Sequence, residues 1–261
     1  MPAAGPAASI SIACRRKIIL FQPGSSCWSN SREHSAWRSA LSALCSLRHI
    51  LCAMLKLSAL VLAAGESKRM PGKNKLLLPF AGKTIVECTV DTILQADVDE
   101  VILVLGHEAG TIQKVVGDRP IKIVYNPDYR SGMAGSIHTG LKALAPRFSL
   151  KNLLKKVGVM ICLADQPLIQ SAELNLLIAA FSQAKEKSII VPAFKGHRGN
   201  PVIFDLRYRA EILTLKGDAG GKSILARHPE AVLEVEMPAG NIFEDADTPE
   251  SYARLVALNN H

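Results

Sequence analysis

The sequence predicts an α/β fold of the doubly wound kind, with helices on both faces of a mostly parallel, Rossmann-like sheet. From residue 57 onward, short apolar runs alternate with segments in which apolar residues recur every three or four positions. The runs 57–63 and 157–163 are almost continuously apolar, as expected for strands buried on both faces. Repeated alternation of strand and helix favours parallel pairing, because each crossover helix returns the chain to the same edge of the sheet.

The expected elements follow one another without an internal repeat or a linker, so residues 54–261 are expected to form a single domain. The last expected helix begins at Pro249, whose fixed φ and missing N–H suit a first helical turn. The expected strands are 57–63, 100–105, 121–125, 157–163, 188–191, 201–204 and 231–235. The expected helices are 84–95, 111–116, 134–144, 172–184, 206–213, 221–227 and 249–258.

Residues 1–53 differ in composition from the rest of the chain. They hold six basic side chains and one acidic one, whereas the remaining residues hold 25 basic and 22 acidic side chains. Their apolar residues show no sustained strand or helix period before about residue 40. Met54 opens a run typical of the first strand of an α/β domain, so we expect residues 1–53 to be upstream sequence from a misassigned start, or disordered. A basic, Ser-rich targeting segment and a genuine extension are the alternatives.

The formal charge of +8 at first favours an anionic partner such as nucleic acid or a membrane surface. Most of that excess lies in residues 1–53, so the domain itself predicts neither partner. The apolar stretch 41–64 is interrupted by Arg48, His49 and Lys56, which are costly at a bilayer centre. We therefore expect a cytoplasmic protein with no membrane and no nucleic-acid partner.

The first motif, 62–79, directly follows the first expected strand. Its small residues let backbone N–H groups approach an anion, and it matches neither a Walker loop nor a G-x-G-x-x-G fingerprint. Taken alone, such a glycine-containing loop favours the alternative of a tight turn whose basic side chains are solvated. Positive charge is concentrated here by Lys68, Arg69, Lys73 and Lys75.

Three further motifs place polar side chains beside expected strand or helix ends. Ser136, in the motif formed by Asn126 and residues 130–141, lies near a helix start, where its hydroxyl can contact a base edge or a phosphate, or can cap the helix. Asp165 follows an apolar strand and suits a hard Mg²⁺ ion, or else caps the next helix. In 243–250, Asp247 is the favoured second metal ligand, and Asp245 or Thr248 can cap the last helix.

Two more motifs lie between these. Gly196-His197-Arg198-Gly199-Asn200-Pro201 has no common structural explanation beyond a solvated turn, and 216–225 is rich in glycine around Lys222.

In this order, the motifs resemble the signature of the MobA-like nucleotidyltransferases that attach a nucleotide to molybdenum cofactor. The form Leu-Ala-Ala-Gly-x-Ser-x-Arg-Met, followed by Lys-Leu-Leu-Leu-Pro, is similar to the cytidylyltransferase branch, whereas the guanylyltransferase branch typically has Leu-Ala-Gly-Gly. The resemblance covers 57–258 and none of residues 1–53. The chain departs from the pattern at Gly221-Lys222, where the family has Ala-Arg, and lysine lacks the bidentate fork of arginine.

The resemblance implies a single-domain nucleotidyltransferase fold and Mg²⁺-dependent transfer of CMP from CTP to the terminal phosphate of molybdenum-loaded molybdopterin, with release of pyrophosphate. It assigns Arg69 and Lys75 to the departing pyrophosphate, and Asp165 to catalysis and, with Asp247, to the metal. By the same resemblance, the nucleotide and the pterin phosphate are bound by Leu62, Ala63, Ala64, Gly65, Ser136, Arg198, Asn200 and Lys222.

The expected partners are CTP and molybdopterin, with a molybdenum hydroxylase or its maturation chaperone as a further partner. The preference for CTP rests mainly on Ala64. Two alternatives stay open: a related transferase that uses GTP or acts on another small molecule such as a sugar phosphate, and a chaperone that holds molybdenum cofactor without catalysis. Loss of CTP-dependent pyrophosphate release would favour the chaperone.

Overall fold

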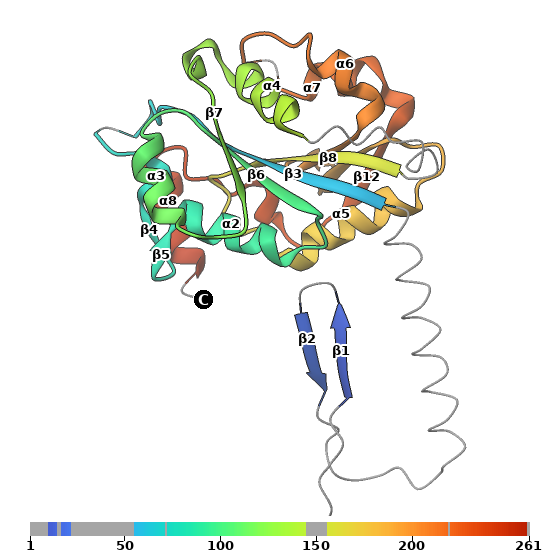
Figure 1. Cartoon of the computed structure of the whole chain (residues 1–261), viewed down its shortest axis with the longest axis horizontal. Helices are drawn as coiled ribbons and strands as arrows, with labels where there is room; N and C mark the ends of the chain where they lie inside the picture. The colour runs from blue at the N-terminus through green and yellow to red at the C-terminus, as the bar shows by residue number, and fades with distance from the viewer. Residues whose placement is uncertain are drawn as a thin grey trace, which may run out of the picture. The chain divides into compact units, whose positions relative to one another are not determined.

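An eight-stranded sheet forms the centre of the computed structural model, which describes residues 10–14, 17–21, 55–70, 72–144, 156–218 and 220–259 (Figure 1). The strand order is β10-β9-β11-β8-β3-β6-β7, and β12 pairs with β9 beside this path. The strands are β3 (Leu55–Ala63), β6 (Glu100–Leu105), β7 (Lys122–Tyr125), β8 (Lys156–Leu163), β9 (Ile189–Phe194), β10 (His197–Arg198), β11 (Val202–Asp205) and β12 (Val232–Glu236).

The sheet is mostly parallel, which confirms the predicted fold class. β3 pairs in parallel with both β8 and β6, β6 pairs in parallel with β7, and β12 pairs in parallel with β9. The exception is β11, which lies antiparallel between β8 and β9, and β10 is antiparallel to β9. Seven residues separate β9 from β11, too few for a crossover helix, so the chain reverses direction there.

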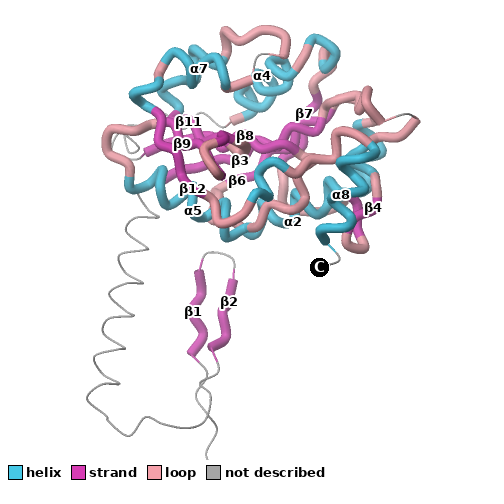
Figure 2. The backbone as a smooth tube through the Cα atoms, turned by 180° about the vertical axis from the view of Figure 1, so that it is seen from behind, coloured by secondary structure: helices cyan, strands magenta, loops and turns pink. Residues whose placement is uncertain are grey.

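Helices cover both faces of the sheet (Figures 1 and 2). On one face, Leu57, Ala59 and Val61 of β3 belong to the same apolar cluster as residues of α2, α3, α5 and α8. On the other face, Leu60 joins the cluster that contains residues of α4, α6 and α7. The helices are α2 (Ile85–Gln95), α3 (Ala109–Val116), α4 (Met133–Ala143), α5 (Ser171–Gln183), α6 (Arg209–Ile212), α7 (Lys222–Arg227) and α8 (Pro249–Asn259).

The expected helix 206–213 differs in detail, because it begins as a 3₁₀ turn, η4 (Leu206–Tyr208), and continues as the short α6. Asp205 caps that turn by accepting a hydrogen bond from the Arg207 N–H, at 2.9 Å. A small hairpin, β4 (Pro79–Phe80) with β5 (Lys83–Thr84), precedes α2 and was not expected from the sequence.

Residues 10–21 correct one expectation for the first 53 residues. β1 (Ile10–Cys14) and β2 (Lys17–Phe21) pair as an antiparallel hairpin, where no strand period was expected. Each strand has five residues, so the apolar pattern is too short to stand out as a period. The proposed start at Met54 falls outside the described residues and stays a prediction. Within the ranges that the structure describes, no helix is both long enough and apolar enough to cross a membrane.

Gly140 allows α4 to pack directly on β3. A Cβ built at Gly140 would lie 1.9 Å from the Leu60 Cδ1 atom, which is fully buried. Alanine at this position would therefore force the helix away from the sheet, although alanine is the better helix former.

We predict that Gly140→Ala lowers the free energy of unfolding by about 1–3 kcal/mol, the usual cost of an overpacked core. The matched control is Gly110→Ala in α3, where an added Cβ meets no atom within 4 Å. That variant should be unchanged or stabilised by up to about 1 kcal/mol. Urea titration followed by circular dichroism measures both, and equal stabilities of the two variants would contradict this account of the packing.

Candidate active site

A cavity of about 460 Å³ opens where β3 and β8 end. Because these strands are parallel neighbours, their carboxyl ends lie at the same edge of the sheet, where α/β folds bind ligands. Nine of the sequence-predicted site residues line it: Leu62, Ala63, Ala64, Gly65, Arg69, Lys75, Ser136, Asp165 and Asp247. The rest of the lining is Glu66, Ser67, Lys68, Leu76, Tyr129, Arg130, Gly132, Met133, Leu163, Asp218 and Asp245.

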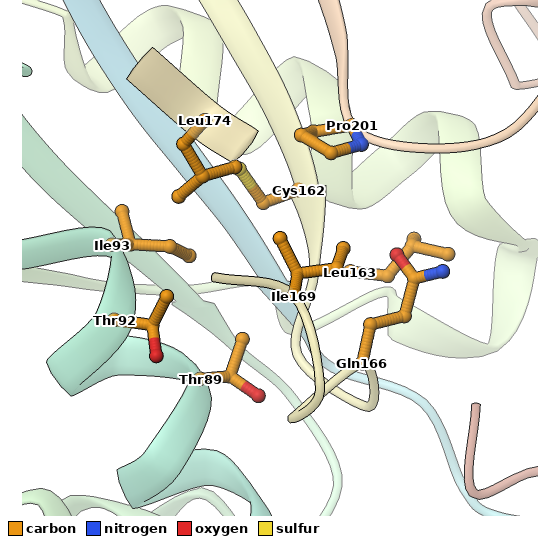
Figure 3. A pocket seen from close by; sticks show the side chains of 9 residues that line it. All are labelled: Thr89, Thr92, Ile93, Cys162, Leu163, Gln166, Ile169, Leu174 and Pro201. Carbon is orange, nitrogen blue, oxygen red and sulfur yellow. The ribbon is translucent and has the colours of Figure 1, made fainter. Parts of the chain in front are cut away.

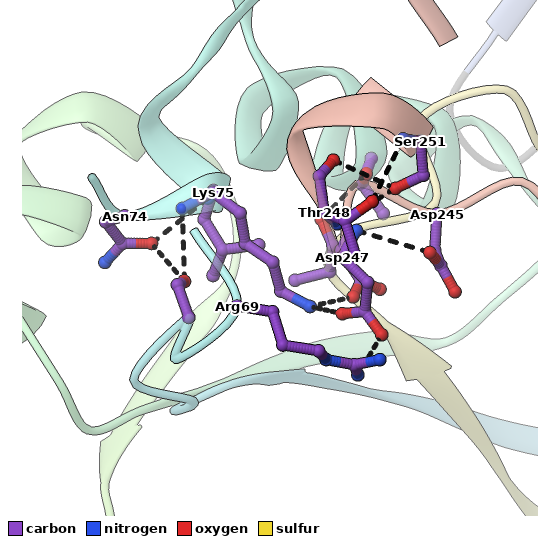
Figure 4. A network of polar contacts seen from close by, with 12 residues as sticks. Arg69, Asn74, Lys75, Asp245, Asp247, Thr248 and Ser251 are labelled. Carbon is purple, nitrogen blue, oxygen red and sulfur yellow. Dashed lines mark hydrogen bonds and ion pairs between the residues drawn. The ribbon is translucent and has the colours of Figure 1, made fainter. Parts of the chain in front are cut away.

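The loop after β3 is held by hydrogen bonds that place Lys75 at the cavity. Ser67 has a positive φ of 54°, and its hydroxyl oxygen accepts a hydrogen bond from the Lys75 N–H at 3.1 Å. Asn74 caps the following 3₁₀ turn, η1 (Lys75–Leu77), by accepting from the Leu76 N–H at 3.1 Å (Figure 4). The two bonds fix the backbone N–H groups of Lys75 and Leu76, and they thereby limit the directions in which the Lys75 side chain can leave the loop.

Lys75 connects two carboxylates that lie 90 and 172 positions after it in the sequence. Its ammonium donates to Asp165 Oδ2 and, at 2.5 Å, to Asp247 Oδ1, while the Arg69 guanidinium donates to Asp247 Oδ2 (Figure 4). The side chains of Lys75 and Asp165 are only 16% and 11% exposed. Burial alone would lower the pKa of Lys75, but the Asp165 and Asp247 carboxylates outweigh it, and the pKa lies above its usual value. Lys75 is therefore a permanent cation at the centre of the cavity.

The two carboxylates are held in place by backbone contacts between their segments. The Ala164 N–H donates to the Leu62 carbonyl at 3.1 Å, which continues the β3–β8 ladder up to Asp165. The Ala246 N–H then donates to the Asp165 carbonyl at 3.2 Å. Gln166, which the sequence analysis did not single out, adds a third tie through its side-chain amide to the Ile242 carbonyl at 2.8 Å. These bonds join the end of β8 to the segment before α8.

Neither aspartate caps a helix, so the alternative readings of Asp165 and Asp245 as caps are wrong. The N-cap of α5 is Gln170, five residues beyond Asp165. Before α8, the Thr248 hydroxyl accepts from the Ser251 N–H at 3.2 Å and so serves as the cap. Asp245 instead accepts from the Asp247 N–H at 3.3 Å and lines the cavity. Burial, together with the Asp247 and Asp165 charges, raises the pKa of Asp245.

The carboxylates are a fitting but partial ligand set for a divalent cation. Asp165 Oδ1 is buried and accepts no hydrogen bond from any described residue. Carboxylate oxygens are the ligands that Mg²⁺ and Mn²⁺ prefer. Among the described residues, no group of three or more His, Cys, Asp and Glu side chains is arranged to hold a metal. An ion on Asp165 and Asp247 would thus need further oxygens from a bound substrate, as is usual for Mg²⁺.

Ser136 lies in the first turn of α4 and is held by Asn126. Its hydroxyl oxygen accepts a hydrogen bond from the Asn126 side-chain NH₂ group at 3.0 Å, and the side-chain oxygen of Asn126, Oδ1, accepts one from the Asp128 N–H at 3.1 Å. The N-cap of α4 is Gly132, so the alternative of Ser136 as the helix cap is wrong. Gly132 has a φ of 106°, and a Cβ there would lie 2.5 Å from the Gly217 carbonyl oxygen. This close packing brings the loop around 217 to the cavity wall.

Three predicted site residues lie outside the cavity lining. Arg198 is exposed on β10 and donates from two nitrogens to Glu234 Oε1, at 2.7 and 2.8 Å. Asn200 is half-buried just before β11, and Lys222 is exposed at the start of α7. The structure therefore brings nine of the twelve predicted site residues together in one cavity and places Arg198, Asn200 and Lys222 outside its lining.

Sequence reasoning also left several cavity residues unassigned. Arg130 pairs with Glu66 across the cavity at 3.0 Å, and its guanidinium lies 5.6 Å from the centre of the Tyr129 ring. These two residues belong to a 3₁₀ turn, η2 (Tyr129–Ser131). Arg130 opens the run 130–141 of the second motif, but no role was expected for it, and Tyr129 lies outside that motif. Asp218 lies in the glycine-rich motif 216–225, but within that motif only Lys222 was expected to bind a ligand.

A second, much smaller pocket is lined by the last two residues of β8, Cys162 and Leu163, and by residues that pack around them (Figure 3). Its volume is about 10 Å³, which is the scale of one water molecule. Burial raises the pKa of the Cys162 thiol there, so this cysteine is an inert part of the core. The lining is mostly apolar and consists of Thr89, Thr92, Ile93, Cys162, Leu163, Gln166, Ile169, Leu174 and Pro201.

Comparison with known proteins gives relatives that match nearly their whole length. Nicotine blue oxidoreductase of Paenarthrobacter nicotinovorans is 31% identical over 205 residues, which cover 76% of this chain and 96% of that protein. The purine catabolism protein PucB of Bacillus subtilis (strain 168) is 29% identical over 201 residues, which cover 73% and 91% of the two chains.

Among solved structures, Rv0371c of Mycobacterium tuberculosis H37Rv is 28% identical and superposes with a TM-score of 0.68, covering 78% of this chain and 98% of that one. A structure of the same mycobacterial protein in complex with manganese gives a TM-score of 0.63 at 27% identity, covering 77% and 98%.

The family match agrees with the geometry of the cavity. Residues 59–232 match the MobA-like NTP transferase domain, a span that runs from β3 to the first residue of β12 and contains Lys75 and Asp165. Asp247 lies beyond the matched span, but the ion pair with Lys75 ties it to the same cavity. The chain therefore belongs to the MobA-like NTP transferase family and is a nucleotidyltransferase.

Proposed function

We propose that this protein transfers CMP from CTP to the terminal phosphate of molybdenum-loaded molybdopterin, in a Mg²⁺-dependent reaction that releases pyrophosphate and forms molybdopterin cytosine dinucleotide. The observation that carries the proposal is the meeting of two cations, Lys75 and Arg69, with two carboxylates, Asp165 and Asp247, beside the small residues 62–65. Such a cavity matches the charge of a nucleoside triphosphate with its metal.

The nucleotide would lie along the loop after β3. Ala63, Ala64 and Gly65 have little or no side chain, which allows a ligand to approach the backbone closely. A Cβ at Gly65 would meet no atom within 4 Å, so the space beside the loop is open. Ser136, held by Asn126, lines the same cavity and is proposed to contact the base. The choice of CTP over GTP rests on Ala64, by resemblance to the cytidylyltransferase branch.

Asp165 and Asp247 would hold the metal, with the remaining ligands supplied by the triphosphate. When bound, the ion would neutralise charge on the phosphates. The manganese complex of the mycobacterial relative supports a divalent cation in this fold, and Mg²⁺ is the ion that we propose here. Glu66, Asp218 and Asp245 add three further carboxylates to the wall, so five acidic side chains balance the basic side chains of Lys68, Arg69, Lys75 and Arg130 in the empty cavity.

The chemistry needs no base from the protein. An oxygen of the molybdopterin phosphate attacks the α-phosphorus of CTP, the bond from that phosphorus to the bridging oxygen breaks, and pyrophosphate leaves with the electron pair. A phosphate is already anionic at neutral pH, which is consistent with a described lining that contains no histidine or cysteine. The protein then contributes alignment and charge: Lys75 and Arg69 stabilise the leaving pyrophosphate.

The pterin side is proposed to include Arg198, Asn200 and Lys222. Pro201, which follows Asn200, lines the small pocket together with Leu163 at the end of β8 (Figure 3). The 196–201 segment is therefore close to the strand end that carries Asp165, although it does not line the cavity. The exposed Arg198 guanidinium, 46% accessible, is free to exchange Glu234 for a phosphate at little cost.

The central test incubates the protein with Mg²⁺, molybdenum-loaded molybdopterin and each of the four ribonucleoside triphosphates, and measures pyrophosphate. We expect release with CTP that exceeds release with GTP, and a cytosine dinucleotide as the second product. Release with GTP alone, or with a sugar phosphate in place of molybdopterin, would favour the related transferase. Tight binding of molybdopterin without any pyrophosphate release would favour the chaperone.

Asp165→Asn should lower kcat by about a hundredfold or more, the usual loss on removing a charged group that acts on the transition state. The amide keeps the shape of the side chain but loses the charge that pairs with Lys75 and would bind the metal. Asp118→Asn, which changes an exposed aspartate after α3, is the control and should retain full activity. Single-turnover kinetics measure the step, and an unchanged rate for Asp165→Asn would remove Asp165 from the mechanism.

Arg198→Ala is expected to raise the KM for molybdopterin about tenfold while leaving the KM for CTP unchanged, because the arginine lies outside the nucleotide cavity. The matched control is Arg227→Ala, which removes another half-exposed arginine that pairs with a glutamate, Glu211, at 3.0 Å. A rise in the KM for CTP, or equal effects of the two variants, would refute the assignment of Arg198 to the pterin side.

A further inference from the structure

We propose that Lys75 is an internal counter-ion that holds the metal-binding carboxylates while the cavity is empty, so that the divalent cation enters together with the nucleotide. The nucleotide phosphates would then take over Lys75, and the metal would take over Asp165 and Asp247. This inference rests on one part of the proposed function, namely that a divalent cation and a triphosphate share this cavity. It does not depend on which nucleotide or acceptor is used.

The contacts show that Lys75 occupies the carboxylates that a metal would need. One ammonium donates to an oxygen of Asp165 and to an oxygen of Asp247, and these two residues belong to different segments, one after β8 and one before α8. A cation that bound both aspartates would have to share or displace the same oxygens. Lys75 and the metal are therefore competitors for one pair of ligands.

Burial makes this competition strong for Lys75 and weak for Arg69. The Lys75 side chain is 16% exposed, so an ammonium that lost both carboxylates would remain buried without a counter-charge, which is costly. The Arg69 side chain is 68% exposed and can release Asp247 to water with little loss. A metal that arrives alone must therefore leave a buried positive charge unpaired. A metal that arrives with a triphosphate supplies Lys75 with new anionic partners.

The unpartnered oxygen of Asp165 indicates that Lys75 is an incomplete substitute for a cation. Oδ2 receives the Lys75 ammonium, while Oδ1 is buried and has no hydrogen-bond partner among the described residues. A buried carboxylate oxygen without a partner is destabilising, and a metal ion that accepts more than one oxygen would remove this cost. In the empty cavity, the carboxylates are thus held by a cation that satisfies fewer of their oxygens than a divalent metal ion would.

The expected consequence is a reciprocal coupling between metal and phosphate ligands. If the triphosphate raises the affinity for the metal by relieving Lys75, the metal must raise the affinity for the triphosphate by the same factor. Removal of Lys75 should break this link and open the carboxylates to the metal alone.

The test titrates Mn²⁺ without nucleotide or acceptor and follows free Mn²⁺ by electron paramagnetic resonance. Lys75→Met should bind Mn²⁺ at least about tenfold more tightly than the wild-type protein, within the usual range of coupling between sites. The matched control is Lys73→Met, which removes an exposed lysine of the same loop and should leave Mn²⁺ affinity unchanged. The double variant Lys75→Met/Asp165→Asn should lose the gain, which assigns the tighter site to Asp165.

A second titration adds inorganic tripolyphosphate as the phosphate probe. Wild-type affinity for Mn²⁺ should rise by a larger factor than that of Lys75→Met, because the variant has no ammonium to relieve. Lys75→Gln, which keeps a polar side chain, serves as a second variant if Lys75→Met does not fold, and its thermal unfolding confirms an intact domain.

Equal Mn²⁺ affinities of the wild type and both Lys75 variants would overturn the proposal, and so would a gain that survives Asp165→Asn. Neither result depends on cytidylyl transfer. If CTP and molybdopterin fail to react while Lys75→Met still gains Mn²⁺, the proposed substrates are wrong and the role of Lys75 stands. If they react while Mn²⁺ affinity does not change, the reverse holds.

Discussion

The parallel pairing of β3 with β8 is the constraint on which the rest of the site depends. It runs from Leu55 with Lys156 to Leu62 with Leu163 and is extended by the bond from Ala164 to Leu62. A slip of this register would move the loop after β3 away from Asp165 and would also turn every core side chain of β3 to the opposite face. The buried alternation of Leu57, Ala59 and Val61 against Leu60 prevents such a slip, so hydrophobic packing determines where the charges meet.

The ion pairs of Lys75 add to hydrophobic packing in determining the geometry of the site. Lys75 links the loop after β3 and the end of β8, which adjoin one ladder, to the segment before α8, which pairs with neither strand. Since the ammonium is buried, its ion pairs are screened little by salt and are costly to break one at a time. The Gln166 amide and the Ala246 N–H add neutral bonds across the same junction. These contacts together fix the three segments relative to one another at the position of the charged side chains.

The sequence predicted most of this fold because the strands buried on both faces are unusually apolar. The bounds of β6 agree with the expected 100–105, and β8 and α2 differ from theirs by one residue. The antiparallel direction of β11 was not predicted. The four-residue apolar run carries no direction itself, and only its short distance from β9, too small for a crossover helix, indicates the reversal. The hairpin of β1 and β2 was missed for a similar reason, since two five-residue strands show too little alternation.

The site was predicted unevenly for a physical reason. Small residues after a strand, and an aspartate after a strand, mark a position at the sheet edge that sequence order alone can give, so Gly65 and Asp165 were found. Pairing between distant segments cannot be seen in this way. Thus Lys75 was expected to contact only phosphate, and no role was expected for Gln166. Arg198 was placed by resemblance, and its partner Glu234 lies on β12, a strand that pairs with β9 and that sequence spacing does not bring near Arg198.

The reversed direction of β11 has a consequence for how such an enzyme can diversify. Val202 pairs with Ile161 near the end of β8, so the short segment 195–201 enters the sheet at the edge where Asp165 lies, without a crossover helix. Insertions and substitutions in such a surface hairpin disturb few core contacts. Under the proposed function, one part of the domain is held by its parallel register and retains the phosphate chemistry. The segment 195–201 is a short hairpin in which sequence changes can alter the molecule that is bound without disturbing the parallel strands.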